Sequence, residues 1–391
     1  MIRALLNNPE RPEQQPVLVC FPIVNHDEVY EMLGKIDVGS AIGRDCGVEE
    51  IAGDYPALAR LEDTVVNLDE LDYLAKRLES FDKTEIAKFQ SCAEAFNYKG
   101  LPDLINLTFC CQETTVIQDF TDINAIGLLH HLDVNGAAAV DELKYLDGSK
   151  IARNLFQHEK GLVTPYGVLY ENGMEMEQVY KGREFPRYWY DDRVMELAVT
   201  KLSEREDTPY ITWLYLPMTD KQIDRSLERG GFESWGDMRL ELYDYMMPPN
   251  AAKIVKGSGE CLENLNALAK TLSGMSEGAL KKLDAVIEYA EPDSAERVTR
   301  LAENLEYFKF VEGALTPEDY GRRAVELAGN TPFADGLDEF IDFQKYGERL
   351  ISNLNGKFVS GGHVSYNGLK PIEELMRDAP AEHMDMGMEM Y

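Results

Sequence analysis

LDELDYLAKRLESFD, residues Leu68–Asp82, has a second version later in the chain, LENLNALAKTLSGMS, residues Leu262–Ser276. At an offset of 194 residues (262 − 68) the two stretches share Leu68/Leu262, Leu71/Leu265, Leu74/Leu268, Ala75/Ala269, Lys76/Lys270 and Leu78/Leu272. The leucines recur at helical spacing, so each stretch is predicted to be a helix with one face in a core. The acids between the leucines are predicted to face water.

The similarity continues upstream of the repeated helix. VLVCFPIVNHDEVYEML (Val17–Leu33) corresponds to TWLYLPMTDKQIDRSL (Thr212–Leu227). Each reads as a short apolar strand that ends before a proline and is followed by a polar cap and a helix. Asn25 and Thr219 are the residue types that cap helix N-termini, and we expect them to do so here.

The similarity also continues downstream. Tyr145–Gly173 aligns with Phe340–Gly368 at an offset of 195 residues (340 − 145). Both stretches read as a helix followed by a hairpin, and both end in Asn-Gly. That dipeptide suits a tight turn with positive backbone φ.

The chain is therefore predicted to be a tandem duplication. Its 391 residues fit two to four domains. The segment between the copies contains the aromatic run FPRYWY and the stretch RVMELAVTKL, so we expect a packed connector that ends in a helix. The predicted divisions are an N-terminal extension (1–16), unit 1 (17–173), the connector (174–210), unit 2 (211–368) and a disordered acidic, Met-rich tail (369–391).

The charge of the chain is its most unusual bulk property. It has 39 basic and 70 acidic residues, a formal net charge of −31. A DNA duplex carries that much charge over roughly 50 Å, or about 15 base pairs. Such a protein should be repelled by nucleic acid and by anionic membranes, and attracted to basic proteins. A solvated surface that only confers solubility is the simpler alternative.

Motifs that carry out catalysis are not recognisable in the sequence. KGSGECLE (Lys256–Glu263) lacks the full pattern of a nucleotide-binding loop, and DVNGAAAVDE (Asp133–Glu142) has Ala137 where a calcium loop needs an oxygen ligand. The six cysteines contain no C-x-x-C, and the neighbours His130 and His131 cannot share a face. We therefore predict a non-enzymatic cytoplasmic protein with reduced, mostly buried thiols, no cofactor, no metal and no membrane segment.

The second copy resembles a known family. Its most specific residues are IDFQKYGERL (Ile341–Leu350) and GKFVS (Gly356–Ser360), preceded by YDYMMP (Tyr243–Pro248) and the leucine helix. In this order they are similar to the ArdA antirestriction family of conjugative plasmids and transposons. The first copy departs more, because LDGSKIARNL lacks the aromatic residues found at Phe343 and Tyr346.

The resemblance implies an elongated, acidic α+β protein built of small subdomains that pairs as a dimer. ArdA proteins mimic bent B-form DNA and occupy the DNA groove of type I restriction–modification enzymes. A tandem copy would build that dimer within one chain, with pseudo-twofold symmetry and contacts near 145–173 and 340–368. A further homodimer of whole chains stays open.

Carboxylates along the repeated helices are the expected binding residues, acting as an array in place of DNA phosphates. They are Glu62, Asp63, Asp69, Glu70, Asp72, Glu79, Asp82, Glu85, Glu260, Glu263, Glu277, Asp284, Glu288, Glu291, Asp293, Glu296, Glu303 and Glu306. A single reversal, Glu70→Lys or Asp72→Lys, is expected to cost little, whereas reversing five or more acids along one edge should abolish binding.

Two other functions fit the same residues. One is a DNA mimic aimed at another defence nuclease, such as a CRISPR effector. The other is an acidic, non-catalytic interaction module of a conjugative element. Mimicry predicts binding that competes with duplex DNA and weakens with salt, and the interaction module predicts neither.

Overall fold

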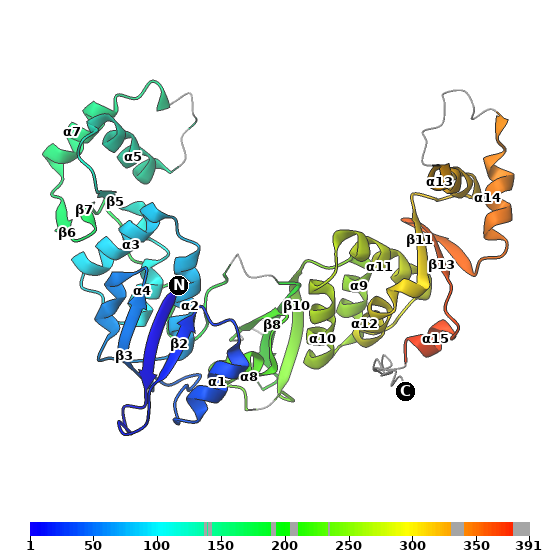
Figure 1. The fold of residues 1–391 in the computed structure, drawn as a ribbon, viewed down its shortest axis with the longest axis horizontal. Helices are drawn as coiled ribbons and strands as arrows, with labels where there is room; N and C mark the ends of the chain where they lie inside the picture. Colours follow the sequence, from blue (N-terminus) through cyan, green and yellow to red (C-terminus); the bar gives the residue numbers. More distant parts are fainter. Residues whose placement is uncertain are drawn as a thin grey trace, which may run out of the picture. The chain divides into compact units, whose positions relative to one another are not determined.

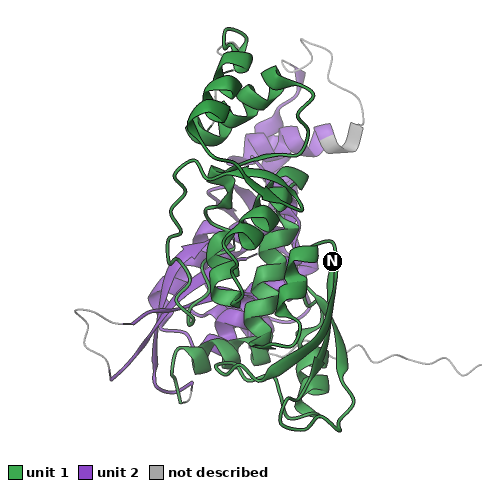
Figure 2. Cartoon of the chain, turned by 90° about the vertical axis from the view of Figure 1, so that its left-hand side faces the viewer, with its two compact units in different colours: residues 1–191, 219–233 green, residues 192–218, 234–391 purple. Residues whose placement is uncertain are grey.

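The chain forms two compact units, coloured green and purple in Figure 2. Unit 1 comprises Met1–Asp191 and Thr219–Glu233, and unit 2 comprises Asp192–Met218 and Ser234–Tyr391. The computed structural model describes residues 1–136, 139, 143–188, 193–203, 210–233, 235–329 and 340–377. Both units combine helices with small antiparallel sheets, so the predicted α+β class is confirmed.

Unit 1 begins with a four-stranded antiparallel sheet in the order β2-β1-β3-β4 (Figure 1). The elements of this region are β1 (Ile2–Asn7), β2 (Val17–Phe21), α1 (His26–Gly34), β3 (Cys46–Gly53), the 3-10 helix η1 (Pro56–Leu61) and β4 (Val65–Val66). Three helices follow, which are α2 (Leu68–Glu79), α3 (Lys83–Ala95) and α4 (Leu101–Leu107).

The rest of unit 1 joins a three-stranded sheet, in the order β5-β7-β6, to a pair of helices. Its elements are η2 (Cys111–Glu113), β5 (Thr115–Ile117), α5 (Ile123–Asn135), α7 (Gly148–His158), β6 (Leu162–Thr164) and β7 (Gly167–Tyr170). One more helix of unit 1, α8 (Asp220–Arg229), comes from much later in the chain.

Unit 2 contains two three-stranded sheets, in the orders β10-β8-β9 and β11-β13-β12. Its first part consists of β8 (Met195–Lys201), β9 (Thr212–Leu216), β10 (Met238–Tyr245), α9 (Pro249–Ser258), α10 (Leu262–Ser273), α11 (Glu277–Ala290) and α12 (Ala295–Glu303). Its second part consists of η3 (Leu305–Tyr307), β11 (Phe308–Glu312), α13 (Pro317–Gly329), α14 (Phe343–Ile351), β12 (Gly356–Val359), β13 (Gly362–Tyr366) and α15 (Ile372–Leu375).

The strand pairing corrects two of the predicted boundaries. Residues 1–16 are not an extension, because β1 is an inner strand that pairs with both β2 and β3. Likewise RVMELAVTKL forms β8 rather than a helix, and β8 pairs with both β9 and β10. The sequence of β8 does alternate, with Met195, Leu197 and Val199 on one face, but Met, Glu, Leu and Ala are strong helix formers and suggest a helix instead.

Two further predictions about the ends of the copies are wrong in part. The segment from Leu369 is not disordered throughout, because it includes α15, where Leu375 and Met376 are buried. The tail beyond 377 lies outside the described residues. Asn172 and Gly173 have the expected positive φ values of 53° and 78°, whereas neither residue of the second Asn-Gly pair has a positive φ.

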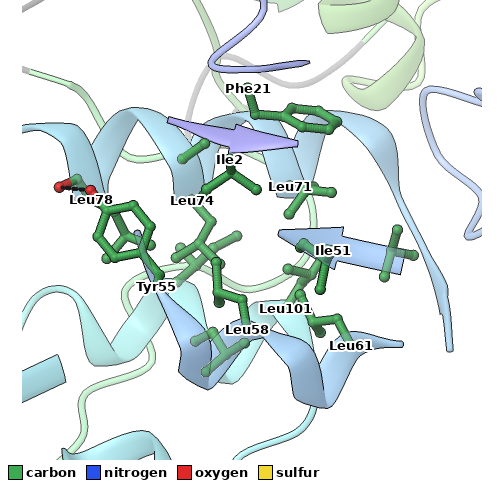
Figure 3. Packing of buried hydrophobic residues seen from close by; sticks show 14 of the residues in the cluster. Ile2, Phe21, Ile51, Tyr55, Leu58, Leu61, Leu71, Leu74, Leu78 and Leu101 are labelled. Atoms are coloured by element: carbon green, nitrogen blue, oxygen red, sulfur yellow. Dashed lines mark hydrogen bonds between the residues drawn. The ribbon is translucent and has the colours of Figure 1, made fainter. Parts of the chain in front are cut away.

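The local predictions for the repeated segments are confirmed. The side chain of Asn25 caps α1 by accepting from Glu28 N, and Thr219 caps α8 within a capping box. The leucines of α2 and α10 are buried. In unit 1 they meet the first sheet and η1, and Tyr55 donates from its hydroxyl to Leu78 O at 2.9 Å (Figure 3).

Each unit also has a pair of tightly crossed helices, α5 with α7 and α13 with α14. Glycines allow the close approach: a Cβ at Gly127 would lie 1.8 Å from Gly148 O, and one at Gly347 would lie 1.7 Å from Pro317 O. No side chain fits at either crossing.

Candidate acidic interaction surface

The acids of α2 are the first test of the predicted surface, and three of them are buried. Asp69, Glu70 and Asp72 retain only 8%, 5% and 6% of their accessible surface. The prediction that they face water is therefore wrong. The helix carries leucines toward the sheet on one side, and on the other it is covered by α1, α8 and residues 180–186.

Asp69 neutralises two partly buried arginines of α8. Its carboxylate accepts from Arg225 Nε and Nη2 at 3.0–3.1 Å and also from Arg229 Nη1. Tyr30 donates to the same carboxylate at 3.3 Å, and the Arg225 guanidinium lies 4.2 Å from the centre of the Tyr30 ring. Asp69 thus attaches α8 to the body of unit 1, and a carboxylate used in this way cannot also face a partner.

Glu70 is bound within an aromatic cluster. Tyr180 donates from its hydroxyl to Glu70 Oε1 at 3.1 Å, and Arg44 Nε lies 3.7 Å from Oε2. The Tyr180 ring stacks on Phe185, which in turn stacks on Tyr73. Burial raises the pKa of Glu70, against the lowering effect of Arg44 and of the tyrosine hydrogen bond.

Asp72 accepts a backbone hydrogen bond, and its counterpart in unit 2 does the same without a charge. Asp72 Oδ1 accepts from Ile23 N at 2.6 Å. At the offset of 194 residues the counterpart is Asn266, whose Oδ1 accepts from Met218 N at 3.0 Å. Both bonds hold the chain just after the proline that ends β2 or β9. The position therefore needs an oxygen acceptor, and the neutral Asn266 in the aligned sequence was the available sign of this role.

These three positions also overturn the expectation for single charge reversals. Glu70→Lys would place a cation beside Arg44, and Asp72→Lys would remove the acceptor of Ile23 N. Both changes bury an unpaired charge, which costs several kcal/mol. Neither variant can therefore test the surface.

The five other candidates of unit 1 lie at or near the surface. Glu62 is half-buried and accepts from the backbone of β3 at 3.2 Å. Asp82 and Glu85 form the capping box that begins α3, so both have a structural role. Asp63 and Glu79 are exposed.

Three candidates of unit 2 are half-buried and bind the backbone of neighbouring segments. Glu260 Oε1 accepts from Ala295 N at 2.6 Å, where α12 begins. Asp284 Oδ1 accepts from the first turn of α9 at 2.8 Å. Glu288 accepts from the backbone N–H and the hydroxyl of Ser360 at 3.0 Å. These carboxylates contribute charge, but their positions are explained by the fold.

The remaining candidates of unit 2 are exposed. They are Glu263, Glu277, Glu291, Asp293, Glu296, Glu303 and Glu306. Several have basic neighbours one helical turn away: Glu277 pairs with Lys281 at 3.0 Å and Asp293 with Arg297 at 2.8 Å. Such pairs are weak and leave the carboxylates accessible to water. With Asp63, Glu79 and Asp82 of unit 1, these seven residues form what we call the exposed acid set.

Other exposed acids were missed by the sequence prediction. Asp27, Glu28 and Glu31 lie on the outer side of α1, and Glu49 and Glu50 lie on β3. The signal for the first two was present, because acids directly after an N-cap favour the first turn of a helix and face solvent there.

Most of the thiols, and the carboxylate of Asp133, are buried side chains. All six cysteines are free and four are buried, as predicted. Burial raises the pKa of Cys92 to about 12 and that of Cys110 to about 11, so both are protonated thiols at neutral pH. Asp133, the first residue of the rejected calcium-like stretch, forms a buried ion pair with Lys88 at 2.6 Å. Residues 137–138 and 140–142 of that stretch lie outside the described part.

Among the described residues, no group of three or more His, Cys, Asp or Glu side chains is placed to hold a metal ion. Over the same ranges no helix has the length and apolar character to cross a membrane. The chain matches no protein-family model and no curated protein.

Proposed function

We propose that the protein is a non-catalytic inhibitor that mimics DNA and blocks the DNA-binding groove of a type I restriction–modification enzyme. The observation that carries the proposal is the surplus of 31 negative charges, joined to ten candidate acids that remain exposed. The resemblance of the second copy to ArdA proteins supports the choice of target.

The physical basis is competition for a basic groove. Lysines and arginines that neutralise DNA phosphates release counterions when they bind, and an array of carboxylates can release counterions from the same groove. No single carboxylate is decisive, because an exposed ion pair contributes little by itself. Binding should therefore depend on the number of exposed acids and fall steeply with salt.

The two units contribute differently to this surface. Unit 2 supplies seven members of the exposed acid set, mostly on and after α11 and α12. Unit 1 supplies three, because Asp69, Glu70 and Asp72 are used internally. Unit 1 also exposes Asp27, Glu28, Glu31, Glu49 and Glu50, so we assign the mimicry to both units.

The decisive experiment measures binding of the whole chain to a type I methyltransferase core, with a DNA duplex as competitor, at low and at raised salt. Competitive binding that is lost as salt rises supports mimicry. Absence of binding at low salt rejects this target, and a second screen against CRISPR effectors then tests the same chemistry on another DNA-binding machine. Unchanged restriction of unmodified DNA in cells that contain the protein would also count against the proposal.

A variant with Glu277, Glu291, Asp293, Glu296 and Glu306 all changed to Lys sharpens this test. Each reversal adds two charges, so the formal net charge falls from −31 to −21. We expect the variant with five reversals to lose binding. The control with the single reversal Glu296→Lys should bind with an affinity within about threefold of the wild type. Equal binding by all three proteins would show that these acids are not part of the interface.

A further inference from the structure

Unit 2 contains a cavity of about 650 Å³ between its first sheet and helix α10. Its wall is mixed, and polar groups share it with apolar side chains that include Leu197 on β8, Leu240 and Leu242 on β10, and Leu262 and Leu265 on α10. This volume is typical of a ligand site, which usually measures roughly 300–1,000 Å³.

Unit 1 has the same strands and the same helix, but there the corresponding space is filled. The strand register makes Leu240 and Leu242 of β10 the counterparts of Val48 and Ile51 of β3, since each pair lies opposite the same two positions of the central strand. Val48 and Ile51 are buried, whereas Leu240 and Leu242 are only partly covered. The difference must come from what lies over them.

In unit 1 the cover is the stretch of chain that follows β3. Leu58 and Leu61 of η1 belong to the same cluster as Ile51 (Figure 3). The next residues extend the sheet: Val48 N donates to Thr64 O and Val48 O accepts from Asp63 N, both at 2.9 Å. Strand β4 continues this pairing and buries Val66 in the core.

In unit 2 the chain after β10 takes a different course. It forms α9, which packs against α11 and α12 and contributes Val255 and Lys256 to the border of the cavity. Among the strands that the structure describes, β10 is the last of its sheet. Leu240 therefore lies on the edge strand of its sheet in unit 2. Its counterpart in unit 1, Val48, instead makes two backbone hydrogen bonds with the neighbouring segment of chain.

We propose that β10 and the cavity behind it form a docking site for an extended segment of a partner protein. The segment adds to the sheet along Met238–Leu240, as β4 adds to β3 in unit 1, and places a branched apolar side chain in the cavity. Unit 1 identifies the occupant, because the equivalent space is filled there by a short extended peptide with an inward valine. This inference does not depend on the proposed function.

The charges around the cavity restrict the partner further. Glu241 and Glu263 line it and are exposed, and Glu260 is half-buried beside them. Lys256 is the basic residue of the lining, and its Nζ lies 4.7 Å from the centre of the Tyr245 ring. A partner segment with basic residues next to its apolar one complements this rim.

The probe for the test comes from the chain itself. It is a synthetic peptide with the sequence of Leu61–Asn67, LEDTVVN, in which Glu62→Lys and Asp63→Lys supply the basic residues. Cys261 lines the cavity and is exposed, and Cys20 is the other exposed thiol. In a Cys20→Ser background, the rate of alkylation at Cys261 therefore reports whether the cavity is occupied.

We expect about 1 mM peptide to slow alkylation of Cys261 about tenfold, because a bound segment blocks access to the thiol. The unaltered acidic peptide should protect less, and the advantage of the basic one should shrink with salt. Leu240→Arg should abolish protection. The matched control Leu202→Arg, at an exposed residue just after β8 that is not part of the lining, should retain it.

Three outcomes would overturn the proposal. One is no protection at about 1 mM peptide in a chain whose circular dichroism is unchanged. Another is equal protection by a peptide with both valines changed to serine. The third is protection by a small apolar dye such as anilinonaphthalene sulfonate but not by the peptide, which would assign the cavity to a small molecule.

Discussion

Helices α2 and α10 are two versions of one sequence, and they have different surroundings. Both bury a leucine face against the first sheet of their unit. On the opposite side α2 is covered by arginines and aromatic rings, whereas α10 exposes Glu263, Ala267 and Lys270. The comparison shows that an apolar stripe predicts which side of a helix is buried against the core, but not whether the opposite side is covered.

The aligned polar positions make the difference specific. At the offset of 194 residues, Asp69 corresponds to Glu263 and Asp72 to Asn266. Asp69 binds two arginines in the interior, and Glu263 faces water. Asp72 and Asn266 make the same backbone hydrogen bond. Asp69 and Glu263 are thus both acids with different roles. Asp72 and Asn266 have the same role as acceptors although only Asp72 is an acid.

The largest effect is expected from removing the carboxylate that distinguishes α2. Asp69→Ala leaves the partly buried guanidinium groups of Arg225 and Arg229 without this counter-charge, so we expect unit 1 to lose about 3 kcal/mol of stability. Hydrogen exchange at the amides of α2 and α8 measures this loss locally.

The matched control is Glu263→Ala, at the equivalent position of α10. Because Glu263 is exposed, exchange in α10 should change by less than about 0.5 kcal/mol. Equal, small effects at the two sites would show that Asp69 does not hold α8 in solution. The proposed difference in role between Asp69 and Glu263 would then be wrong.

A smaller effect is expected where the two helices agree. Asp72→Ala and Asn266→Ala each leave a backbone N–H without its acceptor, and we expect each to cost about 1–3 kcal/mol in its own unit. Asp72→Asn keeps the acceptor and should cost less than about 1 kcal/mol. Thermal unfolding and local hydrogen exchange measure both. A loss from Asp72→Asn as large as that from Asp72→Ala would make the charge, which also faces His26 and Lys76, the essential feature.

The smallest effect concerns pH. Burial raises the pKa of Glu70 above its usual 4.5, so at neutral pH the folded protein bears the cost of a buried charge. That cost is full above the folded pKa and disappears below 4.5, where the folded and unfolded states are both protonated. Relative to Glu70→Gln, the wild type should therefore gain stability as pH falls from 7 toward 4.5, within about 1 kcal/mol.

Denaturant titrations of both proteins over this pH range test the trend. Tyr180→Phe sharpens it, because the hydroxyl donates to Glu70 and favours the charged form. Its loss should raise the pKa of Glu70 further and move the change in stability to higher pH. A flat difference between wild type and Glu70→Gln would mean that the carboxylate is solvated.

Local patterns predicted local structure well. The helices from Leu68 and Leu262, the strands before each proline, and the caps Asn25 and Thr219 all depend on neighbours within a few residues. The prediction failed for β8, whose residues Met195–Ala198 are all strong helix formers despite their alternation. It also failed for residues 1–16, whose β1 pairs with residues 40 or more positions away.

The candidate site was predictable only in part. Exposed acids such as Glu296 on α12 and Glu277 on α11 lie where helical periodicity puts them, on the outer faces of their helices. Asp69 could not be placed in the same way, because Arg225 and Arg229 lie 156 and 160 residues away in the chain. Likewise, the open cavity of unit 2 depends on the path of the chain after β10.

By itself the sequence determined the amphipathic helices, their caps and the net charge, because these follow from residue type and from spacing over one or two helical turns. Only the tertiary structure decided which acids face water and which hold arginines, and which copy of the first sheet is filled. The physical reason is that burial depends on what packs against a surface. In unit 1 the arginines of α8 cover the acids of α2, and β4 covers the edge of β3. In unit 2 the chain after β10 takes a different path, and β10 is the edge strand of its sheet among the described strands.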